Sequence, residues 1–133
     1  IFSPMSAAET FLGRIGQTIP NLKVNTTDGE FFLHDYVGEG WAILFSHPAD
    51  YTPVCTTELG RVAQLAPTFA EAGAKLLALS CDSVESHRGW IEDIKAFNKL
   101  EDLPYPIIAD ESREVATAFG MLDPELKDAK GLP

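Results

Sequence analysis

The chain has only two cysteines, Cys55 and Cys81, and no long apolar run. Small secreted domains that depend on disulfides are much richer in cysteine, so two thiols fit a reducing compartment better and we expect a cytoplasmic protein. No stretch approaches the roughly 18 apolar residues that span a bilayer. The first residues also lack the basic start and apolar centre of a secretory signal. We therefore expect no stable membrane association.

Basic residues are scarce, with 10 Lys and Arg against 20 Asp and Glu, and the formal net charge is −10. This charge opposes approach to a phosphate backbone, so nucleic acid is not an expected partner. The candidate metal ligands also lack the short paired spacings of zinc sites. They are His34, His47, His87 and the two cysteines. We expect no metal and no other bound cofactor.

What is present is enough for one folded domain. At 133 residues and 45% hydrophobic composition, the chain can bury a substantial core and is not a disordered sequence. Residues 1–11 show no convincing periodicity and are interpreted as a lead-in. Residues 12–133 are interpreted as a single domain without internal repeats.

Strands and helices are predicted to alternate after an initial hairpin. Residues 19–31 read as two extended pieces around an Asp28-Gly29 turn. Buried strands are predicted at 41–46, 75–81 and 107–109, and helices from Thr52 to about 72, at 84–98 and at 112–119. This order predicts an α/β fold with a mostly parallel sheet and right-handed crossovers. Periodicity alone leaves thioredoxin-like and flavodoxin-like sheets open.

Cys55 lies where the first buried strand is followed by a helix. Thr52 is expected to cap this helix and Pro53 to occupy its first position, because proline presets φ and has no N–H to leave unsatisfied. Cys55 then falls in the first turn. Free backbone N–H groups and the positive end of the helix dipole favour an anion there, so the thiol is expected to lose its proton more easily than a free thiol.

The spacing Pro48-x-x-x-Thr52-x-x-Cys55 resembles the active-site signature of the peroxiredoxin family. Residues 45–60 as a whole are similar to the one-cysteine, peroxiredoxin 6 type, and so are residues 24–27, 79–84 and 120–124. The resemblance implies a thioredoxin-like fold in which the motif loop follows a central strand. It also implies that the sequence is the N-terminal part of a longer chain, with the family's active-site arginine beyond Pro133.

The resemblance implies a thiol-dependent peroxidase that acts in antioxidant defence. The Cys55 thiolate would reduce hydrogen peroxide or organic hydroperoxides, with phospholipid hydroperoxides as a candidate class, and would become a sulfenic acid. Cys55 and Thr52 are the expected catalytic residues, and Pro48 and His47 the expected substrate-binding residues. An external thiol such as glutathione would restore Cys55, and the resemblance also implies a homodimer.

Two alternatives bear on this interpretation. Cys81 ends an apolar strand and is interpreted as a core residue, and it does not form the C-x-x-C spacing of dithiol oxidoreductases with Cys55. A one-cysteine mechanism is therefore favoured over disulfide exchange. The competing function is a binding or chaperone-like protein that keeps a thioredoxin-like fold but is catalytically incomplete.

Overall fold

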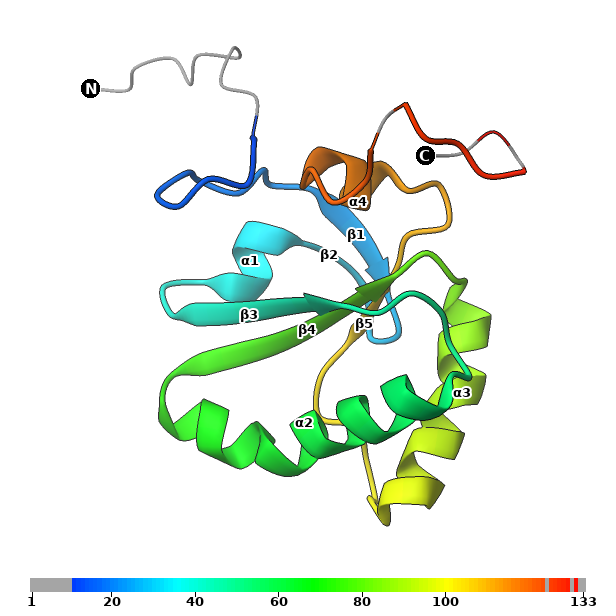
Figure 1. Cartoon of the computed structure of the whole chain (residues 1–133). Coiled ribbons are helices and arrows are strands. Elements are labelled where there is room, and N and C mark those ends of the chain that lie inside the picture. Colours follow the sequence, from blue (N-terminus) through cyan, green and yellow to red (C-terminus); the bar gives the residue numbers. More distant parts are fainter. Residues whose placement is uncertain (1–10, 124, 130, 132–133) are drawn as a thin grey trace.

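The computed structural model describes residues 11–123, 125–129 and 131, and these form one sheet with helices on both faces (Figure 1). The predicted lead-in at residues 1–11 lies almost entirely outside the described residues. The strands are β1 (Lys23–Thr26), β2 (Gly29–Phe32), β3 (Trp41–Ser46), β4 (Ala74–Ser80) and β5 (Ile107–Ala109). The helices are α1 (Leu33–Val37), α2 (Pro53–Glu71), α3 (Val84–Asn98) and α4 (Glu114–Ala118).

The predicted hairpin and helices are present at close to their expected positions. Strands β1 and β2 pair antiparallel, and Gly29 after the turn has a φ of +99°, a conformation that glycine adopts without steric cost. Helix α2 ends two residues before Gly73, whose φ of +74° is typical of a helix C-terminus. Helix α3 is capped by Ser83, whose side chain accepts a hydrogen bond from the backbone N–H of Ser86.

The sheet is mixed, whereas a mostly parallel one was expected. Its strand order is β2-β1-β5-β4-β3. The pairs β3–β4 and β4–β5 are parallel, while β1 pairs antiparallel with both β2 and β5. The N-terminal hairpin therefore extends the sheet beyond β5. Thr26 is opposite Ile108 in this pairing, and the N–H of Thr27 donates to the Ile107 carbonyl at 3.1 Å.

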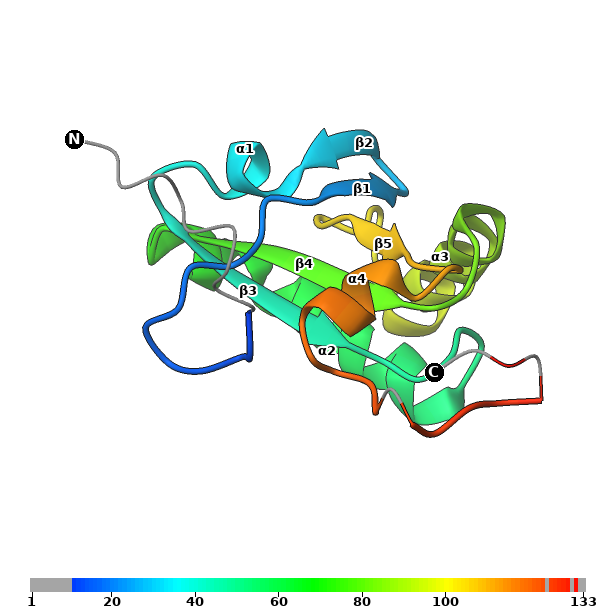
Figure 2. The same cartoon turned by 90° about the horizontal axis from the view of Figure 1, so that it is seen from above.

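Alternating side chains of β4 divide the core into two layers. Leu76 and Ala78 pack with α2 and α3, whereas Leu77 and Leu79 pack with α4 and the hairpin. Figure 1 shows α2 and α3 below the sheet and α4 above it, and Figure 2 shows the same arrangement from above. The sheet therefore separates two core layers, one on each of its faces.

Strand β3, which leads into the cysteine motif, was expected to be buried and, by resemblance, central. It is instead the last strand in the order of the described sheet, paired with β4 on one side. Its side chains are correspondingly open, with Trp41 78% and Ile43 41% exposed. A continuous apolar run indicates burial of both faces of a strand, but it carries no information about whether both edges are paired.

None of the helices in the described part of the chain combines the length and the apolar character that crossing a bilayer requires.

Candidate active site

Cys55 is the third residue of α2, in the first helical turn that the strand-to-helix junction in the sequence predicted. Thr52 is the N-cap residue and Pro53 the first helical residue. The first helical hydrogen bond runs from the backbone N–H of Thr56 to the Thr52 carbonyl at 2.9 Å. The Cys55 side chain is part of the core layer under α2, with Leu59 among its neighbours in that cluster, and the residue is 8% exposed.

The Thr52 side chain does not cap the helix, contrary to expectation. Its backbone has the extended conformation of an N-cap residue, but its hydroxyl makes no capping hydrogen bond to the helix. The hydroxyl instead donates to the Ala49 carbonyl at 3.1 Å. The loop before the helix folds back far enough to bring this carbonyl within reach, so Thr52 closes the loop rather than the helix end.

The loop between β3 and α2 is fixed to its surroundings by backbone hydrogen bonds. The N–H of His47 donates to the Leu79 carbonyl of β4 at 3.1 Å. The N–H of Asp50 donates to Asp82 Oδ2 at 2.7 Å. Tyr51 then adopts a φ of +59°, which is uncommon for a residue with a side chain. The loop that carries the cysteine motif is therefore held against the C-terminal end of β4.

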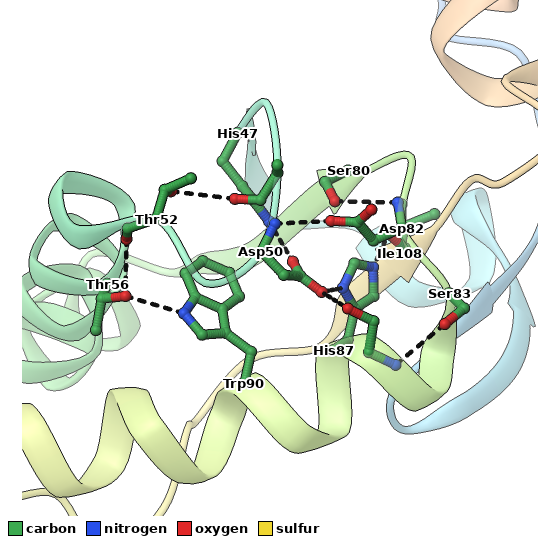
Figure 3. Close-up of polar contacts among 12 residues, drawn as sticks. His47, Asp50, Thr52, Thr56, Ser80, Asp82, Ser83, His87, Trp90 and Ile108 are labelled. Carbon is green, nitrogen blue, oxygen red and sulfur yellow. Dashed lines mark hydrogen bonds and ion pairs between the residues drawn. The ribbon is translucent and has the colours of Figure 1, made fainter.

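A buried cluster of polar side chains lies directly behind this loop (Figure 3). Asp50 Oδ1 is 2.9 Å from His47 Nε2, and Asp50 Oδ2 is 2.6 Å from His87 Nδ1. The Ser86 hydroxyl donates to Asp50 Oδ2 at 2.8 Å, and His87 Nε2 is 3.0 Å from the Ile108 carbonyl. The side chains of the two histidines and the aspartate are at most 3% exposed.

The sequence interpretation named His47 as a site residue, considered His87 only as a metal ligand, and did not name Asp50 or Ser86. A signal for His87 was available. It lies three residues after Val84 and three before Trp90, which places it on the apolar face of the predicted helix. A histidine on such a face needs a buried hydrogen-bonding partner, although the sequence does not tell which residue supplies it.

The hydrogen bonds in this cluster control the ionisation of Asp50. Burial alone would raise the pKa of its carboxyl group, but hydrogen bonds from His47, His87 and Ser86 and the charge of His87 outweigh burial. Together they lower the pKa of Asp50 from 3.8 to about 2. Asp50 is therefore a carboxylate over the whole physiological pH range.

Asp50 should make the protein less stable in acid. Its pKa is lower in the folded than in the unfolded chain, so its stabilising contribution is complete above pH 3.8 and is lost as the pH falls toward 2. We expect a loss of about 2 kcal/mol in the free energy of unfolding over this interval. Urea unfolding of the wild type and of Asp50→Asn between pH 5 and pH 2 measures this contribution. A stability difference between the two proteins that stays constant with pH would contradict it.

Trp90 connects the histidine cluster to the helix of Cys55. Its side chain is fully buried in the same core cluster as Cys55, and its ring lies 4.8 Å from the His47 ring, centroid to centroid. Its indole N–H donates to the Thr56 hydroxyl at 2.9 Å, and that hydroxyl donates to the Thr52 carbonyl at 2.8 Å. One aromatic side chain thus supports both His47 and the first turn of α2.

His47 and Pro48, the predicted substrate-binding residues, line a cavity of about 480 Å³ together with Cys81 and Arg113. The remaining lining residues are Ser46, Leu79, Ser80, Ala116, Met121 and Leu122. Both predicted substrate-binding residues thus lie in the wall of one cavity. Cys55 belongs to the core layer on the α2 face, and Trp90 is the residue that links it to His47.

Cys81 is not the core residue that was expected. It follows the end of β4, is partly exposed and lies in the cavity on the α4 face. Burial, and then the charge of Asp110, raise the pKa of the Cys81 thiol, although Arg113 acts in the opposite direction. Because Cys55 belongs to the core layer on the other face, the arrangement favours one-cysteine chemistry. Both cysteines are free thiols in the structure.

The fold also assembles a possible set of metal ligands that the spacing along the chain did not indicate. Ligand atoms of His47, Asp50 and His87 lie within 4.8 Å of one another. Their contacts are direct hydrogen bonds of 2.9 and 2.6 Å. Such bonds place protons on the ring nitrogens that a metal would need unprotonated. The contacts are thus those of a hydrogen-bonded cluster.

The chain belongs to the AhpC/TSA family, whose profile matches residues 15–133. Over 122 residues it is 57% identical to Peroxiredoxin-6 of Homo sapiens, covering 90% of this chain and 54% of that protein. The Peroxiredoxin-6 of Gallus gallus is 52% identical over the same length and coverage. These relatives confirm the resemblance to one-cysteine peroxiredoxins.

Solved structures confirm the thioredoxin-like peroxiredoxin fold. A mutant of the Peroxiredoxin 6 of Arenicola marina superposes with a TM-score of 0.81 at 50% identity, covering 89% of this chain and 54% of that one. A yeast mitochondrial 1-Cys peroxiredoxin superposes with a TM-score of 0.82 at 43% identity, covering 90% and 57%. The chain thus spans about half the length of the relatives that it matches.

Proposed function

We propose that this chain carries the peroxide-reacting half of a thiol peroxidase, with Cys55 as the nucleophile. The observation that carries the proposal is the position of Cys55. It is the third residue of α2, behind a fixed loop, in a chain 57% identical to a peroxiredoxin. The Cys55 sulfur attacks one oxygen of the peroxide and the O–O bond breaks. The products are Cys55 sulfenic acid and water or an alcohol.

Ionisation of the thiol is insufficient to account for an efficient peroxidase. An ordinary thiol of pKa ~8.5 is about 3% ionised at pH 7, so full ionisation gains at most about 30-fold, or ~2 kcal/mol of barrier. The rest must come from groups that position the peroxide and stabilise the departing oxygen. We propose the backbone N–H of Cys55, Thr52 and His47 for these roles, with Pro48 shielding the site from water. Thr52 would have to redirect its hydroxyl hydrogen from the Ala49 carbonyl to donate to a peroxide.

Substrate and reductant are proposed from the relatives. Hydrogen peroxide and organic hydroperoxides, including those of phospholipids, are the proposed substrates. The yeast 1-Cys peroxiredoxin is described as resolving its thiol through the glutathione and thioredoxin systems, and we propose a small external thiol such as glutathione here. The low cysteine content of the sequence supports a reducing cytoplasm as the proposed location. The homodimer implied by the resemblance is retained as part of the proposal.

Titration with one equivalent of hydrogen peroxide, followed by mass spectrometry of the cysteine peptides, tests this function. We expect Cys55 to gain one oxygen almost stoichiometrically and Cys81 to stay reduced. Added glutathione should then restore Cys55 and sustain peroxide consumption. Equal, slow oxidation of both thiols would instead favour the catalytically incomplete binding protein, a reading that the exposed Trp41 and Ile43 of β3 support.

A further inference from the structure

The two ring nitrogens of His47 have different surroundings. Nε2 is 2.9 Å from Asp50 Oδ1. Nδ1 is buried and has no hydrogen-bonding partner among the described residues. Buried polar atoms are normally paired, so a lone buried ring nitrogen is a site where a further group can bind. Its protonation decides whether that group must donate or accept a hydrogen.

His87 determines the protonation state of its neighbour. Both of its ring nitrogens face oxygens, Asp50 Oδ2 at 2.6 Å and the Ile108 carbonyl at 3.0 Å. Both nitrogens must therefore carry hydrogens, which is the imidazolium form. This one buried cation already balances the Asp50 carboxylate. A second cation at His47 would be buried without a counter-charge, so His47 is neutral, with its single hydrogen on Nε2 toward Asp50.

We propose that Asp50 and His87 are positioning residues for the Cys55 reaction, because they hold His47 in the form whose Nδ1 accepts a proton. This proposal rests on the proposed peroxidase function and adds to it the residues that act through His47. The Trp90 ring, whose centroid is 4.8 Å from that of His47, packs against the same imidazole. Trp90 also belongs to the core cluster of Cys55, and its indole N–H donates to the hydroxyl of Thr56, the residue after Cys55.

The role of Nδ1 follows from the balance of the reaction. Nδ1 accepts the thiol proton of Cys55, the sulfur forms a bond to one peroxide oxygen, and the O–O bond breaks. The departing oxygen then takes the proton from Nδ1. One thiol and one hydroperoxide give one sulfenic acid and one alcohol or water, and His47 returns to its starting form.

The direct test is the protonation of His47 and His87, read from ¹⁵N side-chain spectra of the reduced wild-type protein. We expect an unprotonated Nδ1 on His47 and two protonated nitrogens on His87. In Asp50→Asn, the amide can donate to Nε2 and thereby favour the other tautomer, with the hydrogen on Nδ1. Cys55 oxidation by hydrogen peroxide should then slow by about a hundredfold, the scale of general acid–base catalysis.

Asp82→Asn is the matched control, because it makes the same chemical change at a residue whose carboxylate accepts from the Asp50 backbone N–H, whereas the His47 ring is bonded to the Asp50 carboxylate. It should keep the wild-type tautomer and lose far less rate. A proton on His47 Nδ1 in a wild-type protein that still oxidises Cys55 overturns this proposal alone, and so does an equal loss of rate in both variants. If His47 has the expected tautomer but hydrogen peroxide does not oxidise Cys55, the proposed peroxidase function is wrong. The positioning role of Asp50 and His87 in that reaction then fails with it.

Discussion

Replacing Cys55 with serine should abolish peroxide consumption and leave the fold nearly unchanged. Sulfur supplies the nucleophile, and an alcohol of much higher pKa cannot replace it at neutral pH, so the rate should fall by at least about a hundredfold. The hydroxyl is a close steric match in the first turn of α2. Since the side chain is 8% exposed, the new hydroxyl needs a partner, and we expect a stability cost of about 1 kcal/mol. Peroxide consumption and urea unfolding measure the two effects.

Cys81→Ser is the internal control for this experiment. Cys81 lies in the cavity on the α4 face, whereas Cys55 belongs to the core layer on the α2 face. The control variant should therefore keep most of the Cys55 oxidation rate. If Cys55→Ser still consumed peroxide and Cys81→Ser did not, the nucleophile would be Cys81. An intramolecular Cys55–Cys81 disulfide in the oxidised wild type would rule out the one-cysteine mechanism.

The sequence was sufficient to place Cys55, because each step depended on local chemistry. An apolar run predicted β3, Pro53 predicted the start of α2, and the interval between them fixed the cysteine in the first helical turn. The hairpin could be predicted for the same reason, since the Asp28-Gly29 pair specifies a tight turn by itself. Features that neighbouring residues determine can be read from a single chain.

The polar cluster could not be predicted in this way, because its members are brought together only by the packing of α3 against the loop. Asp50 and His87 are separated by 37 residues and meet through a 2.6 Å contact. Similarly, the hydroxyl of Thr52 could bond either to the first turn of α2 or to the loop before it. The loop folds so that the hydroxyl donates to the Ala49 carbonyl. The edge position of β3 depends on pairing between distant strands, and the apolar run gives no information about that pairing.

Trp90→Ala should cause the largest loss of stability among the changes considered. The indole is fully buried in the core, and its N–H donates to the Thr56 hydroxyl at 2.9 Å. Its removal leaves a cavity between α2 and α3 and takes away the donor to the part-buried Thr56 hydroxyl, at a cost of about 3–5 kcal/mol. For a chain of this size we expect the midpoint of thermal unfolding to fall by roughly 10–20 °C. Thermal and urea unfolding monitored by circular dichroism measure this loss.

Two further variants separate the causes of that loss. Trp90→Phe keeps an aromatic ring in the cavity but cannot donate to Thr56, so it should cost about 1–3 kcal/mol. Phe97→Ala removes an aromatic side chain from the same helix at a position that is 66% exposed, and it should change stability by no more than about 0.5 kcal/mol. Similar losses for Trp90→Ala and Phe97→Ala would show that Trp90 does not connect α3 to the helix of Cys55. Because Trp90 also supports the His47 ring, Trp90→Ala should slow Cys55 oxidation even at temperatures where the variant remains folded.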